Sequence, residues 1–200
     1  MYVPSHFRES DEHVLAEFIA AHSFGTLVTT ERGAPFVSHL PFLHDREAGL
    51  LHAHVARANP QWQHVAANAD VLVTFQGPHG YVSPTWYAGP GVPTWNYTAV
   101  HVYGRARAID DSAATGRYLE RLAARHERGS AAPWVPRYDP KLLAGIVGIE
   151  IRITEIQGKF KLSQNRSAED RARVAARLEA SGTDNDAALA KLVAGGRSFT

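Results

Sequence analysis

Short β-type segments joined by tight turns fill the first part of the chain, and they constrain its fold more than any other feature. The segments alternate apolar and polar residues and are rich in β-branched residues, which is typical of strands. The predicted strands cover residues 25–30, 35–45, 50–55, 70–75, 98–109 and 145–158. The first three follow one another with no helix between them, which disfavours a doubly wound parallel sheet. We predict a mainly β fold of the α+β class, an antiparallel barrel with peripheral helices.

Helices are predicted at only a few places, where capping residues precede apolar residues at helical spacing. Ser10 is the predicted cap of the first helix, and Pro60 is expected in the first turn of the second. The predicted helices cover residues 10–21, 59–68, 111–126, 168–180 and 184–193. We predict one barrel domain over residues 1–181, followed by a helical tail at 182–200 to which we assign no separate function.

The absence of cysteine from this 200-residue chain excludes disulfides, thiolate zinc sites and cysteine nucleophiles. Apolar residues make up 44%, enough for a core, and no apolar run approaches the ~20 residues of a membrane span. The first segment, MYVPSHFRESDEH, lacks the apolar run of a signal peptide. A reducing compartment is compatible with this composition, so we expect a cytoplasmic protein with no membrane partner.

The stretch from residue 52 to residue 103 combines aromatic residues with glycine and proline. It holds Trp62, Trp86 and Trp95, three of the chain's 4 tryptophans. In a strand, proline removes a hydrogen-bond donor and glycine loses chain entropy. The mixture therefore suits a rigid loop whose rings and N–H groups face a ligand. A long hairpin whose aromatic residues cover the core is the alternative, and the sequence leaves both open.

The motif HVARANPQ, residues 54–61, has the most specific local chemistry. His54 lies near the end of a predicted strand, and Arg57 stands where a helix begins near Asn59 or Pro60. A helix start offers unpaired N–H groups, and the arginine fork matches phosphate oxygens. These residues predict a phosphate site, with an ordinary capped helix and a solvated arginine as the alternative. No Rossmann or P-loop pattern follows a predicted strand.

Eleven histidines invite the question of a metal site. His52 and His54 are two residues apart on one strand, so they share a face, and His39 lies on a strand expected nearby. There is no HExxH motif and no evident acidic third ligand, so we interpret these residues as core or pocket histidines. A triad of Ser38, His39 and Asp45 can be drawn, but no nucleophile-elbow motif supports it.

The segment KFKLSQN, residues 159–165, gathers groups that suit a ligand. Alternation puts Lys159, Lys161 and Ser163 on one face if the strand continues through them. Two ammonium groups and a hydroxyl suit an anion, and the amides of Gln164 and Asn165 suit the edges of a heterocycle. A solvated strand end that leads into a helix is the alternative.

Four motifs together resemble the PaiB-type family, described as FMN-binding negative transcriptional regulators. They are MYVPSHF, HVARANPQW, the block FQGPHGYVSPTWY–VPTWNYTAVHVYG, and GKFKLSQNR. The resemblance runs from Met1 to about Leu178, with the motifs in the same order, and the last residues from about Gly182 lie outside it. It implies a split-barrel flavin-binding fold similar to pyridoxamine-phosphate oxidases. It also implies a homodimer with FMN near the subunit interface.

The resemblance further implies three groups of cofactor-binding residues. One strand would run beneath the flavin, a second segment would hold the ribityl phosphate, and a third would lie close to the ring. In that order the groups are Ser38, His39, Leu40 and Pro41; His54, Val55, Ala56, Arg57 and Asn59; and Lys161, Ser163 and Gln164. Neither catalytic residues nor a metal ligand are assigned by it.

Three functions remain open at the level of the sequence. The chain could be a regulator that senses flavin, a flavin-dependent oxidoreductase acting on a small molecule, or a repressor that reads DNA directly. No nicotinamide motif is evident, and no substrate can be named. A haem ligand among the histidines is a minor option, because some split-barrel relatives bind haem.

Direct DNA reading would rest on the last two predicted helices, which could form a helix-turn-helix. The net charge of the chain is +1, which gives no strong non-specific attraction to DNA. The second of these helices begins TDND, and acidic residues there would face phosphates badly. Arg171, Arg173 and Arg177 are the best contrary evidence, and Arg173 and Arg177 share one helical face. We therefore expect no strong specific DNA binding by the protein alone.

Overall fold

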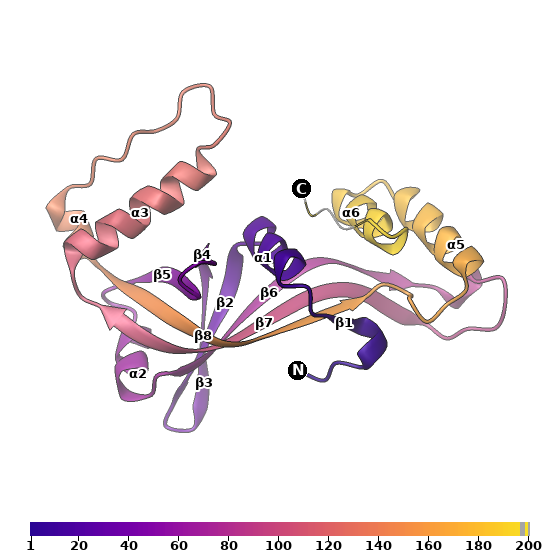
Figure 1. Ribbon diagram of the computed structural model, residues 1–200, viewed down its shortest axis with the longest axis horizontal. Helices are drawn as coiled ribbons and strands as arrows, with labels where there is room; N and C mark the ends of the chain where they lie inside the picture. The colour runs from indigo at the N-terminus through magenta and orange to yellow at the C-terminus, as the bar shows by residue number, and fades with distance from the viewer. Residues whose placement is uncertain (197–198, 200) are drawn as a thin grey trace. The chain divides into compact units, whose positions relative to one another are not determined.

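The computed structural model describes residues 1–196 and 199, and its β-strands follow the order β3-β2-β6-β7-β8-β5-β4, with β1 paired to β8 (Figure 1). Every strand pair with a recorded register is antiparallel. The strand bounds are β1 Arg8–Glu9, β2 Phe24–Glu31, β3 Ala34–Pro41, β4 Leu43–Asp45, β5 Leu50–Ala56, β6 Asp70–Val82, β7 Thr94–Ile109 and β8 Ile146–Lys161. The predicted fold class, mainly β with peripheral helices, is confirmed.

The chain divides into two compact units, which we describe separately. Unit 1 comprises Met1–His22, Phe75–His101 and Gln157–Thr200, and unit 2 comprises Ser23–Thr74 and Val102–Ile156. Three long strands, β6, β7 and β8, contribute residues to both. The boundary that we predict at residue 181 lies inside unit 1 and remains a prediction.

Unit 2 is a curled sheet with three helices. β2 and β3 form a hairpin, β2 also pairs with the start of β6, and β5 pairs with the start of β8. β3 also contacts β5, which is distant from it in the strand order, so the sheet curls back toward itself. Fully buried apolar side chains fill the inside, among them Leu27, Leu51, Val73, Ile149 and Ile151.

Helices α2 (Gln61–Ala67), α3 (Ser112–His126) and α4 (Pro140–Ala144) belong to unit 2. α2 contacts β2, and the fully buried Gln61 amide donates to the Leu27 carbonyl at 3.1 Å and to the Thr29 hydroxyl at 3.2 Å. Asp111 caps α3 by accepting from the Ala113 and Ala114 N–H groups. α3 leads into a loop that returns to α4, which contacts it (Figure 1).

Unit 1 contains the end of β6 (75–82), the start of β7 (94–101) and the end of β8 (157–161). It also contains α1 (Glu12–Ala21), α5 (Ala168–Glu179) and α6 (Asp184–Val193). Phe18 and Ile19 of α1 are fully buried, and the Phe18 ring lies 5.2 Å from that of Phe160. A Cβ at Gly77 would come within 2.7 Å of the Phe18 ring and 2.5 Å of the Thr98 hydroxyl. Glycine in β6 therefore allows α1 to approach the sheet closely.

The last two helices pack side by side in unit 1 (Figure 1). Asn185 of α6 donates from its amide to the His79 carbonyl at 2.8 Å, and its side-chain oxygen accepts from the His79 N–H at 3.2 Å. Leu189 is fully buried. The predicted tail is thus fastened to the β6 segment of the same unit by both hydrogen bonds and apolar contact.

The structure corrects one expectation about local structure and decides two alternatives that the sequence left open. Asp11, rather than Ser10, caps α1 by accepting from the His13 and Val14 N–H groups. The stretch at 76–82 is strand, so most of the aromatic region is a long hairpin and only residues 83–93 connect β6 to β7. β8 ends at Lys161 and Ser163 has a φ of 62°, so strand alternation does not govern Ser163.

Candidate functional site

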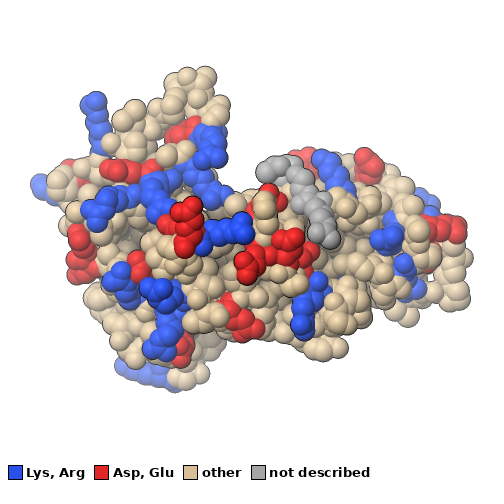
Figure 2. All heavy atoms as spheres, in the orientation of Figure 1, with Lys and Arg blue, Asp and Glu red and all other residues tan. Residues whose placement is uncertain are grey.

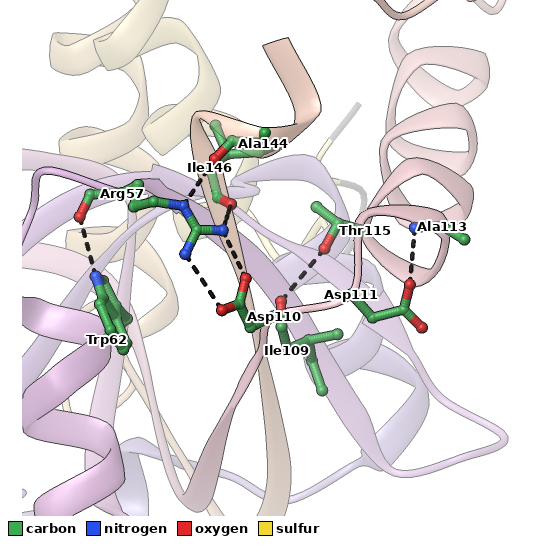
Figure 3. Close-up of polar contacts among 9 residues, drawn as sticks. All are labelled: Arg57, Trp62, Ile109, Asp110, Asp111, Ala113, Thr115, Ala144 and Ile146. Atoms are coloured by element: carbon green, nitrogen blue, oxygen red, sulfur yellow. Dashed lines mark hydrogen bonds and ion pairs between the residues drawn. The ribbon is translucent and has the colours of Figure 1, made fainter. Parts of the chain in front are cut away.

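Arg57 lies at the junction of β5 and α2 and braces two other junctions of unit 2 (Figure 3). Its Nε donates to the Ala144 carbonyl at 2.7 Å, and one Nη donates to the Ile146 carbonyl at 3.2 Å. The same Nη lies 2.5 Å from a carboxylate oxygen of Asp110. This ion pair raises the pKa of Arg57 and lowers the pKa of Asp110. The guanidinium therefore has an internal counterion.

Asn59 connects this junction with the edge strand β3. Its amide nitrogen donates to the Ser38 hydroxyl at 3.0 Å, and its amide oxygen accepts from the Gln61 N–H at 3.0 Å. Helix α2 begins at Gln61, one residue after Pro60, the later of the two predicted start positions. Pro60 is at the cap position. Two motifs that are 21 residues apart along the chain thus meet in unit 2.

The remaining predicted residues of unit 2 lie on both faces of their strands. On β5, Val55 is buried and Ala56 is exposed, while the His54 ring lies 5.9 Å from that of Tyr118 in α3. On β3, Leu40 and Pro41 are half-buried. The exposed His39 ring forms a 3.1 Å hydrogen bond with the Thr26 hydroxyl and stacks on the ring of Phe24.

A cavity of about 610 Å³ lies in unit 2 between α3 and strands β5, β7 and β8. His52 faces it, with its ring stacked 5.9 Å from Tyr118, so His52 and His54 do share a face as predicted. Burial lowers the pKa of both histidines and raises that of Tyr118. The His54 Nδ1 atom is buried without a hydrogen-bond partner among the described residues.

Ion pairs already neutralise much of the charge around this cavity. Arg107 lies 2.7 Å from Glu150, and Arg121 lies 2.9 Å from Asp45. The arginine lowers the pKa of the carboxyl in each pair. Asp45 is therefore paired with Arg121 of α3 and does not form a triad with Ser38 and His39. Within residues 1–196 and 199, no group of three or more His, Cys, Asp or Glu could hold a metal ion.

A second cavity, of about 190 Å³, lies in unit 1 and contains two of the predicted residues, Lys161 and Ser163. Lys161 donates from Nζ to the Thr94 hydroxyl and, at 2.9 Å, to the Trp95 carbonyl. The amide of Asn96 donates to the Ser163 hydroxyl at 2.9 Å, and both side chains are buried. Gln164 does not line this cavity; its side chain bonds the backbone of Phe160 and Leu162.

The predicted site residues thus form two groups that belong to different units. Ser38, Asn59 and Arg57 gather around the β5–α2 junction of unit 2, and Lys161 and Ser163 gather in the cavity of unit 1. Sequence reasoning missed Asp110, Asn96 and Thr94, which lie far along the chain from the motifs that they contact. The Pro-Thr-Trp-Asn run around Thr94 and Asn96 was the only available signal.

The β5–α2 junction has the chemistry that a phosphate requires. Arg57 supplies a guanidinium, and Asn59 and Ser38 supply an amide and a hydroxyl within 3.0 Å of each other. Asp110 is an acidic neighbour that already holds the guanidinium. A phosphate could bind Arg57 only by sharing it with Asp110 or by displacing that carboxylate.

The predicted helix-turn-helix region carries mixed charge. Arg173 lies 3.7 Å from Glu169 of the same helix and also donates to the Trp86 carbonyl at 3.1 Å. Asp184 and Asp186 lie in the first turn of α6. Over the face shown in Figure 2, Lys and Arg side chains are interspersed with Asp and Glu.

No described helix is both long and apolar enough to span a membrane.

Comparison with known proteins shows that the chain belongs to a family of FMN-binding domains. Residues 1–155 match a family model described as "Putative FMN-binding domain". The chain is 38% identical over 201 residues to the protease synthase and sporulation protein PAI 2 of Bacillus subtilis, and the match covers 96% of each chain. It is 32% identical to an uncharacterized protein of Aspergillus fumigatus, again over 96% of each.

Solved structures share the fold. The FAD- and haem-binding protein of Mycobacterium smegmatis superposes with a TM-score of 0.65 at 18% identity, covering 83% of this chain and 79% of that one. The flavocytochrome Anf3 of Azotobacter vinelandii gives a TM-score of 0.64 at 18% identity, covering 80% and 72%. The split-barrel fold implied by the sequence motifs is thereby confirmed.

Proposed function

Because the chain belongs to the family of FMN-binding domains whose model it matches over residues 1–155, and resembles the PaiB type throughout, we propose that it is a homodimeric regulatory flavoprotein. FMN is its cofactor. When bound, the isoalloxazine ring of FMN accepts and releases electrons. The protein's own residues hold the cofactor and set what reaches it.

The observation that carries this proposal is the 3.0 Å hydrogen bond between Asn59 and Ser38 beside Arg57. It joins the strand expected beneath the flavin to the segment expected at the ribityl phosphate. In the proposal, Arg57 and Asn59 bind the phosphate, and the β3 segment from Ser38 to Pro41 supports the flavin. The further residues proposed to bind the cofactor are His54, Val55 and Ala56 of β5, and Lys161, Ser163 and Gln164, the last three near the ring.

An exposed apolar surface on unit 2 supports the homodimer. Phe24 on β2 is 69% exposed and Val37 on the edge strand β3 is 49% exposed. The register places Phe24 opposite Pro41 and Val28 opposite Val37, so these side chains share one face of the hairpin. An exposed hairpin face with apolar side chains is a natural pairing surface for a second copy.

Light scattering after size-exclusion, combined with FMN titration, tests the proposal. We expect a dimer that binds FMN at micromolar concentration or better. Val37→Glu, on strand β3, should produce a monomer. Val135→Glu, at a 69% exposed position in a loop of unit 2, should not. A wild-type monomer with no affinity for FMN would refute the proposal.

A flavin-dependent oxidoreductase is the second candidate function, and the cavity at Lys161 favours it because it offers room for a small molecule. Photoreduction of the FMN-loaded protein, followed by addition of NAD(P)H and of candidate acceptors, distinguishes the two. Turnover would favour the enzyme, and a flavin that is stable to these additions would favour the regulator.

Regulation need not involve direct DNA contact. We expect no nanomolar, sequence-selective binding to promoter DNA at about 150 mM salt, because the first turn of α6, the candidate recognition helix, is acidic. The assay compares the protein's own promoter with unrelated competitor DNA at two salt concentrations. Selective nanomolar binding would show that direct repression is the function.

A further inference from the structure

The cavity of unit 1 is positively charged, and neither of its two cations forms an ion pair with a described residue. Two of its lining side chains, Lys161 and Arg166, are cationic, and none of the described residues that line it is acidic. The hydrogen bonds of Lys161 go to a hydroxyl and a carbonyl, neither of which neutralises an ammonium group. Arg166 lies 4.2 Å from the centre of the Tyr87 ring and donates to the Pro90 carbonyl at 3.5 Å.

Burial makes the ammonium of Lys161 costly. Burial, and secondarily the nearby charge of Lys159, lower the pKa of Lys161 below the ordinary lysine value of 10.5. A partly desolvated cation gains more from an anionic partner than a solvated one does, because water screens the interaction less. An anion entering the cavity would supply that partner.

The neutral groups of the cavity are fixed in place. Asn96 and Ser163 are 1% and 4% exposed, and each side chain donates to the other, at 2.9 Å and 3.3 Å. Ser163 adopts a φ of 62°, a left-handed conformation that costs energy in a residue with a side chain. Such conformations collect at ligand sites, where the surrounding structure maintains them.

We propose that this cavity binds the carboxylate of a small organic acid through Lys161 and Arg166, with the second N–H of the Asn96 amide as a neutral donor that Ser163 holds in place. The inference deepens the proposed function, because Lys161 and Ser163 are also the residues expected near the flavin ring. It names the class of molecule that would serve as substrate or effector of the flavoprotein.

Size and geometry favour a short carboxylate. The volume of about 190 Å³ corresponds to roughly six water molecules at ~30 Å³ each, which suits an acid of a few carbon atoms. A guanidinium fork and an ammonium group together match the two oxygens of a carboxylate. Phe7, Tyr87 and Val92 give the cavity an apolar wall for the carbon chain.

The larger cavity beneath α3 lacks this feature. Its lining includes the acids Asp110, Asp111 and Glu150 as well as Arg117, and its Arg107 and Arg121 are paired with Glu150 and Asp45 at 2.7 and 2.9 Å. An anion there would have to compete with carboxylates of the chain itself. The smaller cavity is therefore the better site for an acidic ligand, although it has less than a third of the volume.

Calorimetric titration of the FMN-loaded protein with propionate, inorganic phosphate and neutral propionamide tests the proposal. We expect propionate to bind more tightly than the other two. Lys161→Met and Arg166→Gln should each weaken propionate by about tenfold or more, the usual scale for one charged hydrogen bond. Lys159→Met is the matched control, because Lys159 donates to the Tyr2 carbonyl and does not line the cavity.

The outcomes separate this inference from the proposed function. Equal weakening by the Lys161 and Lys159 variants, or phosphate binding tighter than propionate, would overturn the carboxylate site while FMN binding stands. Propionate binding by a protein with no affinity for FMN would support the site and refute the proposed function. Competition of propionate with FMN but not with riboflavin would mean that the cavity is the FMN phosphate site, and would overturn the inference.

Discussion

Arg57 in unit 2 and Lys161 in unit 1 are both cations at predicted cofactor positions, but their surroundings differ in one respect. Arg57 lies 2.5 Å from Asp110, so its charge is neutralised by the chain itself. Lys161 donates to a hydroxyl and a carbonyl and lies 6.0 Å from the centre of the Phe7 ring, in a cavity whose described lining is free of acids. An anion must compete for the first cation, whereas the second lacks such a competitor.

The difference follows from what each cation does for the fold. Arg57 connects three chain junctions, at β5–α2, β7–α3 and α4–β8. Asp110, at the β7–α3 junction, strengthens this connection through its ion pair with Arg57. Lys161 ends β8, two residues before Ser163 with its positive φ, and its ammonium donates hydrogen bonds to β7 at Thr94 and Trp95. The position that holds the fold together is thus partly committed, and the position at the strand end is available for a ligand.

The largest expected effect is on FMN affinity in Arg57→Ala. Because only FMN carries the phosphate dianion, FMN binding should weaken by about ten- to hundredfold while riboflavin binding changes little. Parallel fluorescence titrations with the two flavins measure this ratio. Equal weakening of both would show that Arg57 acts through its bracing of the three junctions, and thermal melting would then show a matching loss of stability.

Thr94→Asp should give Lys161 the internal counterion that Arg57 already has. The Thr94 hydroxyl accepts from the Lys161 ammonium, so a carboxylate at this position would neutralise it and repel an incoming anion. We expect propionate binding to weaken by about tenfold. Thr94→Asn, which has the same size without the charge, is the control. Unchanged binding in Thr94→Asp would contradict the assignment of Lys161 to the anion.

Asp110→Asn makes the opposite change in unit 2. It removes the carboxylate that competes for Arg57, so FMN should bind about two- to fivefold more tightly, the scale of one exposed ion pair. Riboflavin affinity should stay the same. If FMN affinity falls instead, Asp110 orients Arg57 for the phosphate rather than competing with it.

The smallest expected effect concerns the pH dependence of propionate binding. Since burial and Lys159 lower the pKa of Lys161, binding should fail as pH rises through a midpoint below 10.5. The unfolded chain holds this proton more tightly than the folded one, so the lysine's contribution to stability rises with pH between that midpoint and 10.5. Lys159→Met should move the midpoint slightly upward, as titrations at several pH values would show.

Most of the fold could be predicted from the sequence, because strands, turns and helices depend on local periodicity. The helices at 168–180 and 184–193 and the strand at 25–30 were predicted to within one residue, whereas the strand predicted at 35–45 is divided into β3 and β4. The aromatic region was harder to interpret, since its glycines and proline indicated a loop. Gly77 lies in a strand, where the missing Cβ leaves room for Phe18 of α1. This close approach comes from tertiary packing, so the local sequence does not reveal it.

By itself, the sequence determined the family, the split-barrel class and the motifs around Arg57 and Lys161, since each depends on residues close together in the chain. Only the tertiary structure decided their partners. Asp110 lies 53 residues from Arg57, and Asn96 lies 67 residues from Ser163. Contacts at such separations depend on strand register and on where each element ends. These long-range contacts decide which cation is already paired and which is open to a ligand.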